Sequence, residues 1–197
     1  MKIVIDGNIG SGKSTQLDML RHIGFNVITE PIEKWPLELF YSDPERWGLL
    51  FQLTILQTLK TEDGFRIYER CPLSSRDVFW KTMKKTELEN TVYLAEFDFH
   101  AWRPDVYIYI SKDPELCHEH IQTRSQRGDS GVSLEYLQSL DKCYTDMFAN
   151  MKDGIVKFKV DGNKPIDDIH REIIDIIRVY HLNYIINGTK SLCVGNK

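Results

Sequence analysis

The sequence predicts an α/β fold in which a parallel β-sheet is covered by helices on both faces. Short runs of β-branched and aromatic residues alternate with longer amphipathic segments, and each run is apolar enough to form a buried strand. Such alternation is typical of parallel strands joined by helical crossovers. The expected strands are KIVID (2–6), FNVIT (25–29), FRIYE (65–69), DVYIYI (105–110) and IVKFKV (155–160).

The amphipathic segments predict the helices that connect these strands. Asp43-Pro44 and Asp113-Pro114 have the residue types that begin helices. We expect one domain over residues 1–182 and a tail, 183–197, in which helical periodicity ends and the chain partly frays. The expected helices are 13–23, 44–60, 87–102, 113–125, 133–151 and 166–182.

The composition argues against several classes of protein. The 197 residues carry a formal net charge of −4, so a basic surface for nucleic-acid polymer is not expected. No apolar run approaches the roughly 20 residues that a membrane span requires. Four scattered cysteines without metal-ligand spacing are typical of a reduced compartment. We therefore expect a cytoplasmic protein that binds neither a membrane nor nucleic-acid polymer.

A glycine-rich motif, GNIGSGKST, lies between the first expected strand and the first expected helix. It matches GxxxxGK(S/T) in the strand, turn and helix context that this pattern requires, and its glycines let backbone N–H groups point at phosphate oxygens. Lys13 can reach the terminal phosphates of ATP, and the Ser14 hydroxyl can join the shell of a magnesium ion. The predicted nucleotide-binding residues are Gly7, Asn8, Ile9, Gly10, Ser11, Gly12, Lys13, Ser14 and Thr15.

Charged residues follow the second and third expected strands. Glu30 comes after the second strand, and Glu69-Arg70 after the third, where residues of an open α/β sheet line a ligand crevice. Glu30 is the candidate general base, because a carboxylate facing the terminal phosphate can accept the proton of an attacking hydroxyl. Glu69 can hold water on magnesium, and Arg70 can stabilise charge on the transferred group. Taken singly, these residues are also common as surface charges.

Several sequence blocks, in order over about residues 2–180, resemble those of the deoxynucleoside kinases. The resemblance implies a P-loop kinase fold with a five-stranded parallel sheet in the order 2-3-1-4-5 and a short lid at about 120–131. It implies transfer of phosphate from ATP, with Mg²⁺, to the 5′-hydroxyl of a deoxynucleoside, and a homodimer. The blocks are GNIGSGKST, EPIEKW, FYSDPERW with FQ just after, ERCPLSSRDVF, RPDVYIYI, DPELC and VSLEYLQSLDKCY.

The resemblance also implies roles for individual residues. Glu30 matches the family's general base, Glu69 its magnesium-linked carboxylate and Arg70 the arginine beside the 5′-oxygen. Gln52 matches the glutamine that pairs with the base edge. The other residues that it places around the nucleoside are Trp35 near the sugar, Tyr41 and Asp129 at the 3′-hydroxyl, and Phe51, Ile55, Leu59, Ser75 and Phe79 around the base.

The lid departs from the family pattern. Family lids are rich in arginine, and Arg124 matches one of these arginines, whereas Arg127 stands one place off register. Either Arg127 moves in to compensate, or the lid holds the phosphates less firmly. Arg124 and Arg127 are both counted among the predicted ATP-binding residues. Asp129 is one methylene shorter than the glutamate that the family often has there.

Two positions favour thymidine, with deoxycytidine as a second substrate. Leu59 and Ser75 stand where deoxycytidine kinases have an arginine and an aspartate, and thymidine-accepting members have small or apolar residues at both. A thymine methyl group requires apolar room. Two rival interpretations are a thymidylate-type nucleoside monophosphate kinase and a nucleotide-binding module that lacks catalysis.

Overall fold

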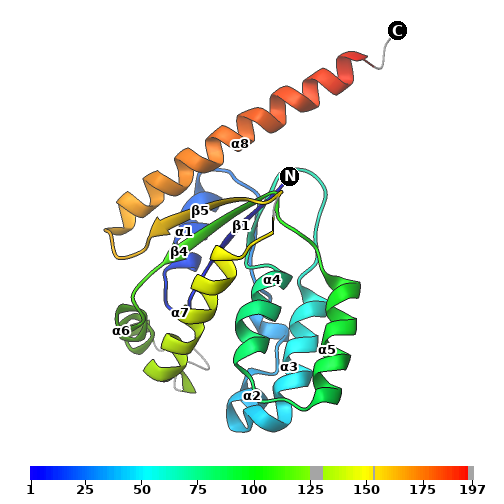
Figure 1. The fold of residues 1–197 in the computed structure, drawn as a ribbon. Coiled ribbons are helices and arrows are strands. Elements are labelled where there is room, and N and C mark those ends of the chain that lie inside the picture. The colour runs from blue at the N-terminus through cyan, green and yellow to red at the C-terminus, as the bar shows by residue number, and fades with distance from the viewer. Residues whose placement is uncertain (125–130, 153, 195–197) are drawn as a thin grey trace.

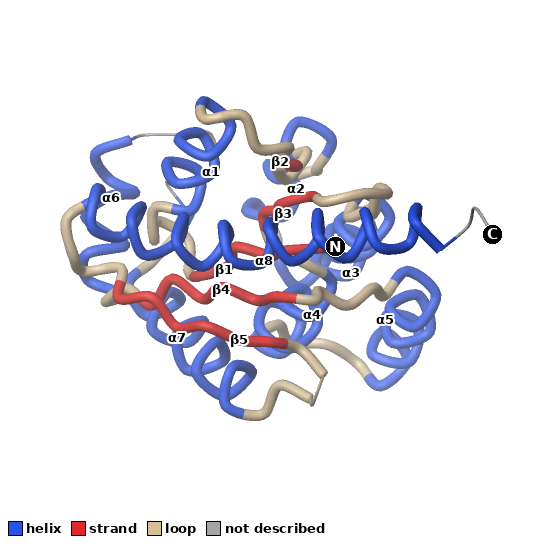
Figure 2. Tube along the Cα trace, turned by 90° about the horizontal axis from the view of Figure 1, so that it is seen from above, coloured by secondary structure: helices blue, strands red, loops and turns tan. Residues whose placement is uncertain are grey.

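Five strands form one parallel sheet in the order β2-β3-β1-β4-β5 (Figure 2). The structure, a computed structural model, describes residues 1–124, 131–152 and 154–194. Its sheet confirms both the predicted parallel arrangement and the predicted strand order. The strands are β1 (Lys2–Gly7), β2 (Val27–Ile28), β3 (Arg66–Glu69), β4 (Val106–Ser111) and β5 (Val156–Asp161).

Helices cover both faces of this sheet, as Figure 1 shows for α8 on one side and α7 on the other. The six expected helices are present, and only the last differs from its expected bounds by more than about two residues. Short helices between β2 and α3 and after β3 were not predicted. The helices are α1 (Lys13–His22), η1 (Ile32–Lys34), α2 (Leu37–Ser42), α3 (Pro44–Thr58), α4 (Pro72–Ser74), η2 (Ser75–Trp80), α5 (Glu87–His100), α6 (Pro114–Arg124), α7 (Leu134–Ala149) and α8 (Ile166–Val194).

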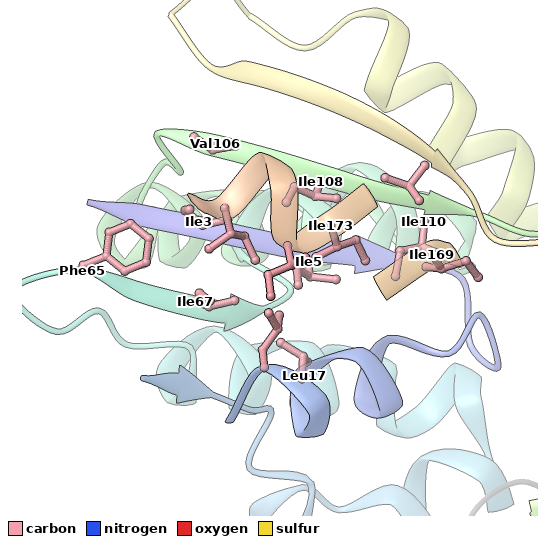
Figure 3. Close-up of a cluster of buried hydrophobic side chains, with 14 residues drawn as sticks. Ile3, Ile5, Leu17, Phe65, Ile67, Val106, Ile108, Ile110, Ile169 and Ile173 are labelled. Atoms are coloured by element: carbon pink, nitrogen blue, oxygen red, sulfur yellow. The ribbon is translucent and has the colours of Figure 1, made fainter. Parts of the chain in front are cut away.

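Two apolar clusters hold the helices on the sheet. Side chains alternate between the faces along a strand, so Ile3 and Ile5 of β1 point to one face and Val4 to the other. On the first face, α1 and α8 pack on the central strands through residues such as Leu17 and Ile173 (Figure 3). On the second face, α7 and η2 pack on the same strands.

Helices α3 and α5 pack beside the sheet and against each other. Leu56 of α3 lies in one apolar cluster with Tyr93 and Phe97 of α5, and all three side chains are buried. The apolar positions of these helices therefore serve in part for packing within the chain. The predicted homodimer stays a prediction.

Two expectations about the last elements were wrong. Strand β5 was expected to be buried, but Val160 is the one buried residue of this strand. β5 pairs with β4 at the edge of the sheet, where the expected strand order places it. The last helix was expected to end at residue 182, but α8 continues to Val194. Residues 178–187 of this helix, including Val179 and Leu182, are mostly exposed. The loss of the amphipathic pattern marked the end of burial and not the end of the helix.

The length of α8 does not make it a membrane helix. Among the helices of the described residues, none combines the length and the hydropathy that crossing a bilayer takes. On its covered side α8 buries Ile169, Ile173, Ile174 and Ile177 against the sheet.

Replacing Ile177 by Ala should lower the free energy of unfolding by about 2–5 kcal/mol, because its side chain is fully buried between α8 and the sheet. Val179→Ala on the same helix is the matched control. Val179 is 56% exposed, so its loss should change the stability by less than about 0.5 kcal/mol. Urea denaturation measures both variants, and equal losses would contradict the packing of α8 described above.

Candidate active site

A cavity of about 440 Å³ lies next to the residues that follow β1, β2 and β3. Polar groups after these strands and aromatic groups from α2 and α3 share its wall. The structure therefore brings most of the predicted site residues together. Those that line the cavity are Ile9, Gly10, Lys13, Ser14, Glu30, Trp35, Tyr41, Phe51, Ile55, Leu59, Glu69, Arg70, Ser75, Phe79 and Arg124.

The glycine-rich loop folds tightly between β1 and α1. Gly10 has a φ of +80°, and a Cβ there would lie 2.4 Å from the carbonyl oxygen of Cys117 in α6. A side chain at this position would therefore collide with the helix behind the loop. Gly12 precedes the first residue of α1 with a φ of +93°. The loop thus leads directly into the N-terminus of a helix, an arrangement that binds anions.

Lys13 lies over the loop that it follows. Its Nζ donates to the carbonyl oxygens of Gly7 at 3.1 Å and Asn8 at 2.9 Å. Burial lowers the pKa of Lys13 to about 8, and Arg70 adds to the decrease, although nearby carboxylates oppose it. A phosphate would supply the negative charge that this buried ammonium lacks.

Ser14 and Glu69 lie side by side at the start of α1 and the end of β3. The Ser14 hydroxyl donates to Glu69 Oε1 at 3.3 Å, and the backbone N–H of Glu30 donates to Glu69 Oε2 at 3.4 Å. No group of three or more His, Cys, Asp or Glu side chains forms a metal site within the described residues. A hydroxyl with one carboxylate suits Mg²⁺ carried by a nucleotide, which takes few protein ligands.

Glu30 and Arg70 form a buried ion pair at the centre of the wall. Arg70 Nη1 donates to Glu30 Oε2, and the side chains of the two residues are 11% and 4% exposed. Burial raises the pKa of Glu30 to about 7, although Arg70 opposes the increase. Glu69 adds to the increase. A carboxyl group with a pKa near 7 can accept a proton and release it again at neutral pH.

Asp6 and Tyr144, which the sequence analysis did not single out, hold the other side of Arg70. Arg70 Nε donates to the Tyr144 hydroxyl at 3.3 Å, and that hydroxyl donates to Asp6 Oδ1 at 2.9 Å. Asp6 is fully buried, and its Oδ1 is also 3.6 Å from Arg70 Nε. A charged residue at the end of an apolar strand, directly before the glycine-rich loop, was the available signal for Asp6. Tyr144 is far away in the sequence and gave none.

The backbone of Arg70 is also unusual. Its φ of +59° lies in the left-handed region, which is uncommon for residues other than glycine. Such conformations concentrate at functional sites, where the surroundings hold them. Here the guanidinium also lies 5.0 Å from the centre of the Phe79 ring. Phe79 thus lines the cavity next to the charged cluster.

Aromatic rings form the apolar end of the cavity. Phe51 of α3 stacks on Phe40 of α2 with ring centres 4.4 Å apart, and the Trp35 ring lies nearly perpendicular to Phe51 with ring centres 6.1 Å apart. Trp35 is fixed by a 2.9 Å hydrogen bond from its Nε1 to the Thr58 hydroxyl. Phe40 lines the cavity but was not predicted, because an aromatic residue in a helix is usually a core residue.

Gln52 lies behind this wall. It is fully buried, and its Oε1 accepts a 2.8 Å hydrogen bond from Ser75, which does line the cavity. Leu59, 8% exposed, lies at the end of α3 on the same wall. The predicted neighbourhood of glutamine, serine and leucine is therefore present, although the amide is one layer further in than expected.

The segment that was expected to form a lid, at about 120–131, is described only in part. Arg124, the last residue of α6, lines the cavity, and His120 Nδ1 lies 3.2 Å from the Gly10 carbonyl oxygen. Arg127 and Asp129 lie outside the described residues. The expected pairing of Asp129 with Tyr41 and the compensating role of Arg127 therefore stay predictions.

The raised pKa of Glu30 predicts a pH-dependent stability. Between about pH 4.5 and pH 7 this site binds more protons in the folded chain than in the unfolded one, so stability falls as the pH rises. Glu30→Gln removes the titrating group and with it this pH-dependent loss of stability. The free energy of unfolding of the variant minus that of the wild type should increase by on the order of 1–3 kcal/mol from pH 4.5 to about pH 8. Urea denaturation at several pH values tests this, and parallel curves would contradict it.

Comparison with known proteins places this cavity in a family. The family model described as deoxynucleoside kinase matches residues 3–185. A protein of Invertebrate iridescent virus 3 that is named as a kinase is 30% identical over 188 residues, covering 89% of this chain and 95% of that protein. The mitochondrial thymidine kinase 2 of Homo sapiens is 32% identical over 160 residues, covering 70% of this chain and 60% of that protein.

A solved structure agrees with the fold. The deoxyadenosine kinase from M. mycoides with bound dCTP has a TM-score of 0.80 at 21% identity and covers 91% of this chain and 100% of its own. This likeness confirms the predicted P-loop kinase fold. Since the family model covers nearly the whole chain, the chain belongs to the deoxynucleoside kinase family.

Proposed function

We propose that the chain transfers the γ-phosphate of ATP to the 5′-hydroxyl of a deoxynucleoside, with thymidine preferred and deoxycytidine as a second substrate. One observation carries the proposal. A single cavity is lined at one end by the phosphate-binding loop and at the other by aromatic rings, and the Glu30–Arg70 pair lies in the wall that they share. A phosphate donor and a flat apolar acceptor can therefore meet at this pair.

The reaction follows from the positions of the charged side chains. The 5′-oxygen attacks the γ-phosphorus, the bond between the γ-phosphorus and the bridging oxygen of ADP breaks, and Glu30 accepts the proton of the hydroxyl. Negative charge on the phosphoryl oxygens shifts during the transfer, and the positive charges of Lys13 and Arg70 stabilise it. Mg²⁺ bound with ATP further neutralises the phosphates, and Ser14 and Glu69 would hold it.

Arg70 also has a positioning role in this mechanism. Its contact with Glu30 Oε2 fixes one oxygen of the carboxylate, while Tyr144 and Asp6 fix Arg70 itself. The base is thus oriented before the substrate binds, which lowers the reorganisation that the reaction requires.

The nucleoside preference depends on the apolar end of the cavity. Ile55 and Leu59 line it with carbon atoms, and Ser75 is the uncharged residue beside them. An apolar wall suits the methyl group of thymine, whereas it leaves the amino group of cytosine without a charged partner. The likeness to thymidine kinase 2 supports this preference.

We also propose that the chain acts in nucleotide salvage in the cytoplasm. Cys71, Cys117 and Cys143, the cysteines whose side chains the structure describes, are free thiols. Free thiols are typical of a reducing compartment.

A turnover panel with purified protein tests the proposed function. ADP release is measured with magnesium ATP and thymidine, deoxycytidine, deoxyadenosine, deoxyguanosine, thymidylate or no acceptor. We expect the largest kcat/KM with thymidine and a smaller one with deoxycytidine. Turnover with thymidylate alone would indicate a nucleoside monophosphate kinase, and no turnover with any acceptor would indicate a binding module.

Glu30→Gln should lower kcat by about 10²- to 10⁴-fold, because the amide cannot accept the hydroxyl proton. ATP affinity should stay close to that of the wild type, since the glycine-rich loop is intact. Glu33→Gln is the matched control, because Glu33 is exposed on η1, three residues further along the chain. An unchanged kcat in Glu30→Gln would remove Glu30 from its role as the base.

A further inference from the structure

A chain of three buried side chains runs from α5 to α3 behind the wall of the cavity. The Tyr93 hydroxyl lies 2.9 Å from Ser75 Oγ, and Ser75 Oγ lies 2.8 Å from Gln52 Oε1. Tyr93 and Gln52 are fully buried and Ser75 is 3% exposed. Ser75 belongs to η2, so three separate elements contribute one residue each.

The direction of the two hydrogen bonds that link Tyr93, Ser75 and Gln52 follows from counting protons. Each hydroxyl has one proton to donate. Burial raises the pKa of Tyr93, so its hydroxyl stays protonated. Within the described residues, Ser75 is the one hydrogen-bond partner found for the Tyr93 hydroxyl. Tyr93 therefore donates to Ser75, and Ser75 in turn donates to Gln52.

The orientation of the Gln52 amide matches this direction, because its oxygen faces Ser75 Oγ and accepts the Ser75 proton. If the amide were turned over, its nitrogen would face Ser75 Oγ, and the Ser75 proton would lose this acceptor. The oxygen of Gln52 is thus bound to Ser75, and one of its two lone pairs stays free.

The nitrogen of the same amide has no such partner. Gln52 Nε2 is buried, and the described residues provide it with no hydrogen-bond acceptor. Its chain neighbour Phe51 and its partner Ser75 both line the cavity, so a bound base would come close to this amide. An acceptor on a ligand would satisfy the nitrogen.

We propose that Tyr93 is a positioning residue for nucleoside recognition, acting through Ser75 to hold the Gln52 amide with its nitrogen ready for an acceptor atom of the base. This inference rests on the proposed function and adds a residue outside the cavity wall to it. The free lone pair of Gln52 Oε1 remains for an N–H donor. The arrangement fits a base edge on which an acceptor adjoins an N–H group.

A double-mutant cycle on Tyr93 and Ser75 tests the proposal, with steady-state kinetics for thymidine and for ATP. Tyr93→Phe and Ser75→Ala should each raise the nucleoside KM by about two- to tenfold, the range expected for one hydrogen bond. The nucleoside affinity measured by calorimetry should fall by a similar factor. The KM for ATP should change by less than about twofold, because neither substitution alters the glycine-rich loop. In the Ser75→Ala background, Tyr93→Phe should have no further effect.

Tyr68→Phe is the matched control for loss of a buried tyrosine hydroxyl. Tyr68 is 2% exposed, and its hydroxyl accepts a 2.9 Å hydrogen bond from the backbone of Glu62, away from the Gln52 chain. Its nucleoside KM should match that of the wild type. Thermal unfolding checks that each variant is folded, and Ser75→Cys replaces Ser75→Ala if the latter does not fold.

Three outcomes would overturn the proposal. They are an unchanged nucleoside KM in Tyr93→Phe, an additive cycle, and an equal rise in KM in Tyr68→Phe. An additive cycle would show that the Tyr93 hydroxyl acts by a route other than its hydrogen bond to Ser75. A wild type that phosphorylates no nucleoside would instead refute the proposed function, so the two failures are distinguishable.

Discussion

The buried guanidinium of Arg70 is the interaction on which the site depends. It contacts Glu30 and lies 3.6 Å from Asp6, and buried charges are tolerated only when they are paired in this way. The register of β1 and β3 brings these groups together. Ile5 pairs with Glu69, so the residues that follow them, Asp6 and Arg70, lie next to each other. A slip of one strand by one residue would place the Asp6 and Arg70 side chains on opposite faces of the sheet.

Two different surfaces meet at this ion pair. The phosphate-binding side is built from the ends of strands and the start of α1, whereas the apolar side is built from α2 and α3. Both sides therefore stand on regular elements, which hold side chains more exactly than loops do. The stack of Phe40 on Phe51 joins α2 to α3 within the apolar side.

Local patterns were sufficient for much of the fold and for the charged part of the site. The glycine-rich motif and the carboxyl ends of successive strands located Lys13 and Glu30, because those features depend on neighbours in the sequence. Asp6, Tyr144 and Tyr93 were not recognised, because their roles depend on contacts between distant segments. Tyr144 and Asp6, for example, are 138 positions apart.

The wrong expectations about β5 and α8 have a similar cause. Whether a strand lies at the edge of a sheet depends on its partners, and no property of IVKFKV alone decides that. Helix α8 continues past the residues that it buries, because backbone hydrogen bonding does not require an apolar face. Both features are set by tertiary arrangement, which single-segment patterns do not contain.

The close approach of Gly10 to α6 limits which substitutions the protein can tolerate at this position. The Cys117 carbonyl occupies the space that any side chain at position 10 would need, and His120 lies against the same peptide unit. Loop and helix are therefore interlocked, and neither can change shape without the other. A substitution that shifts α6 near Cys117 would therefore also shift the phosphate-binding loop.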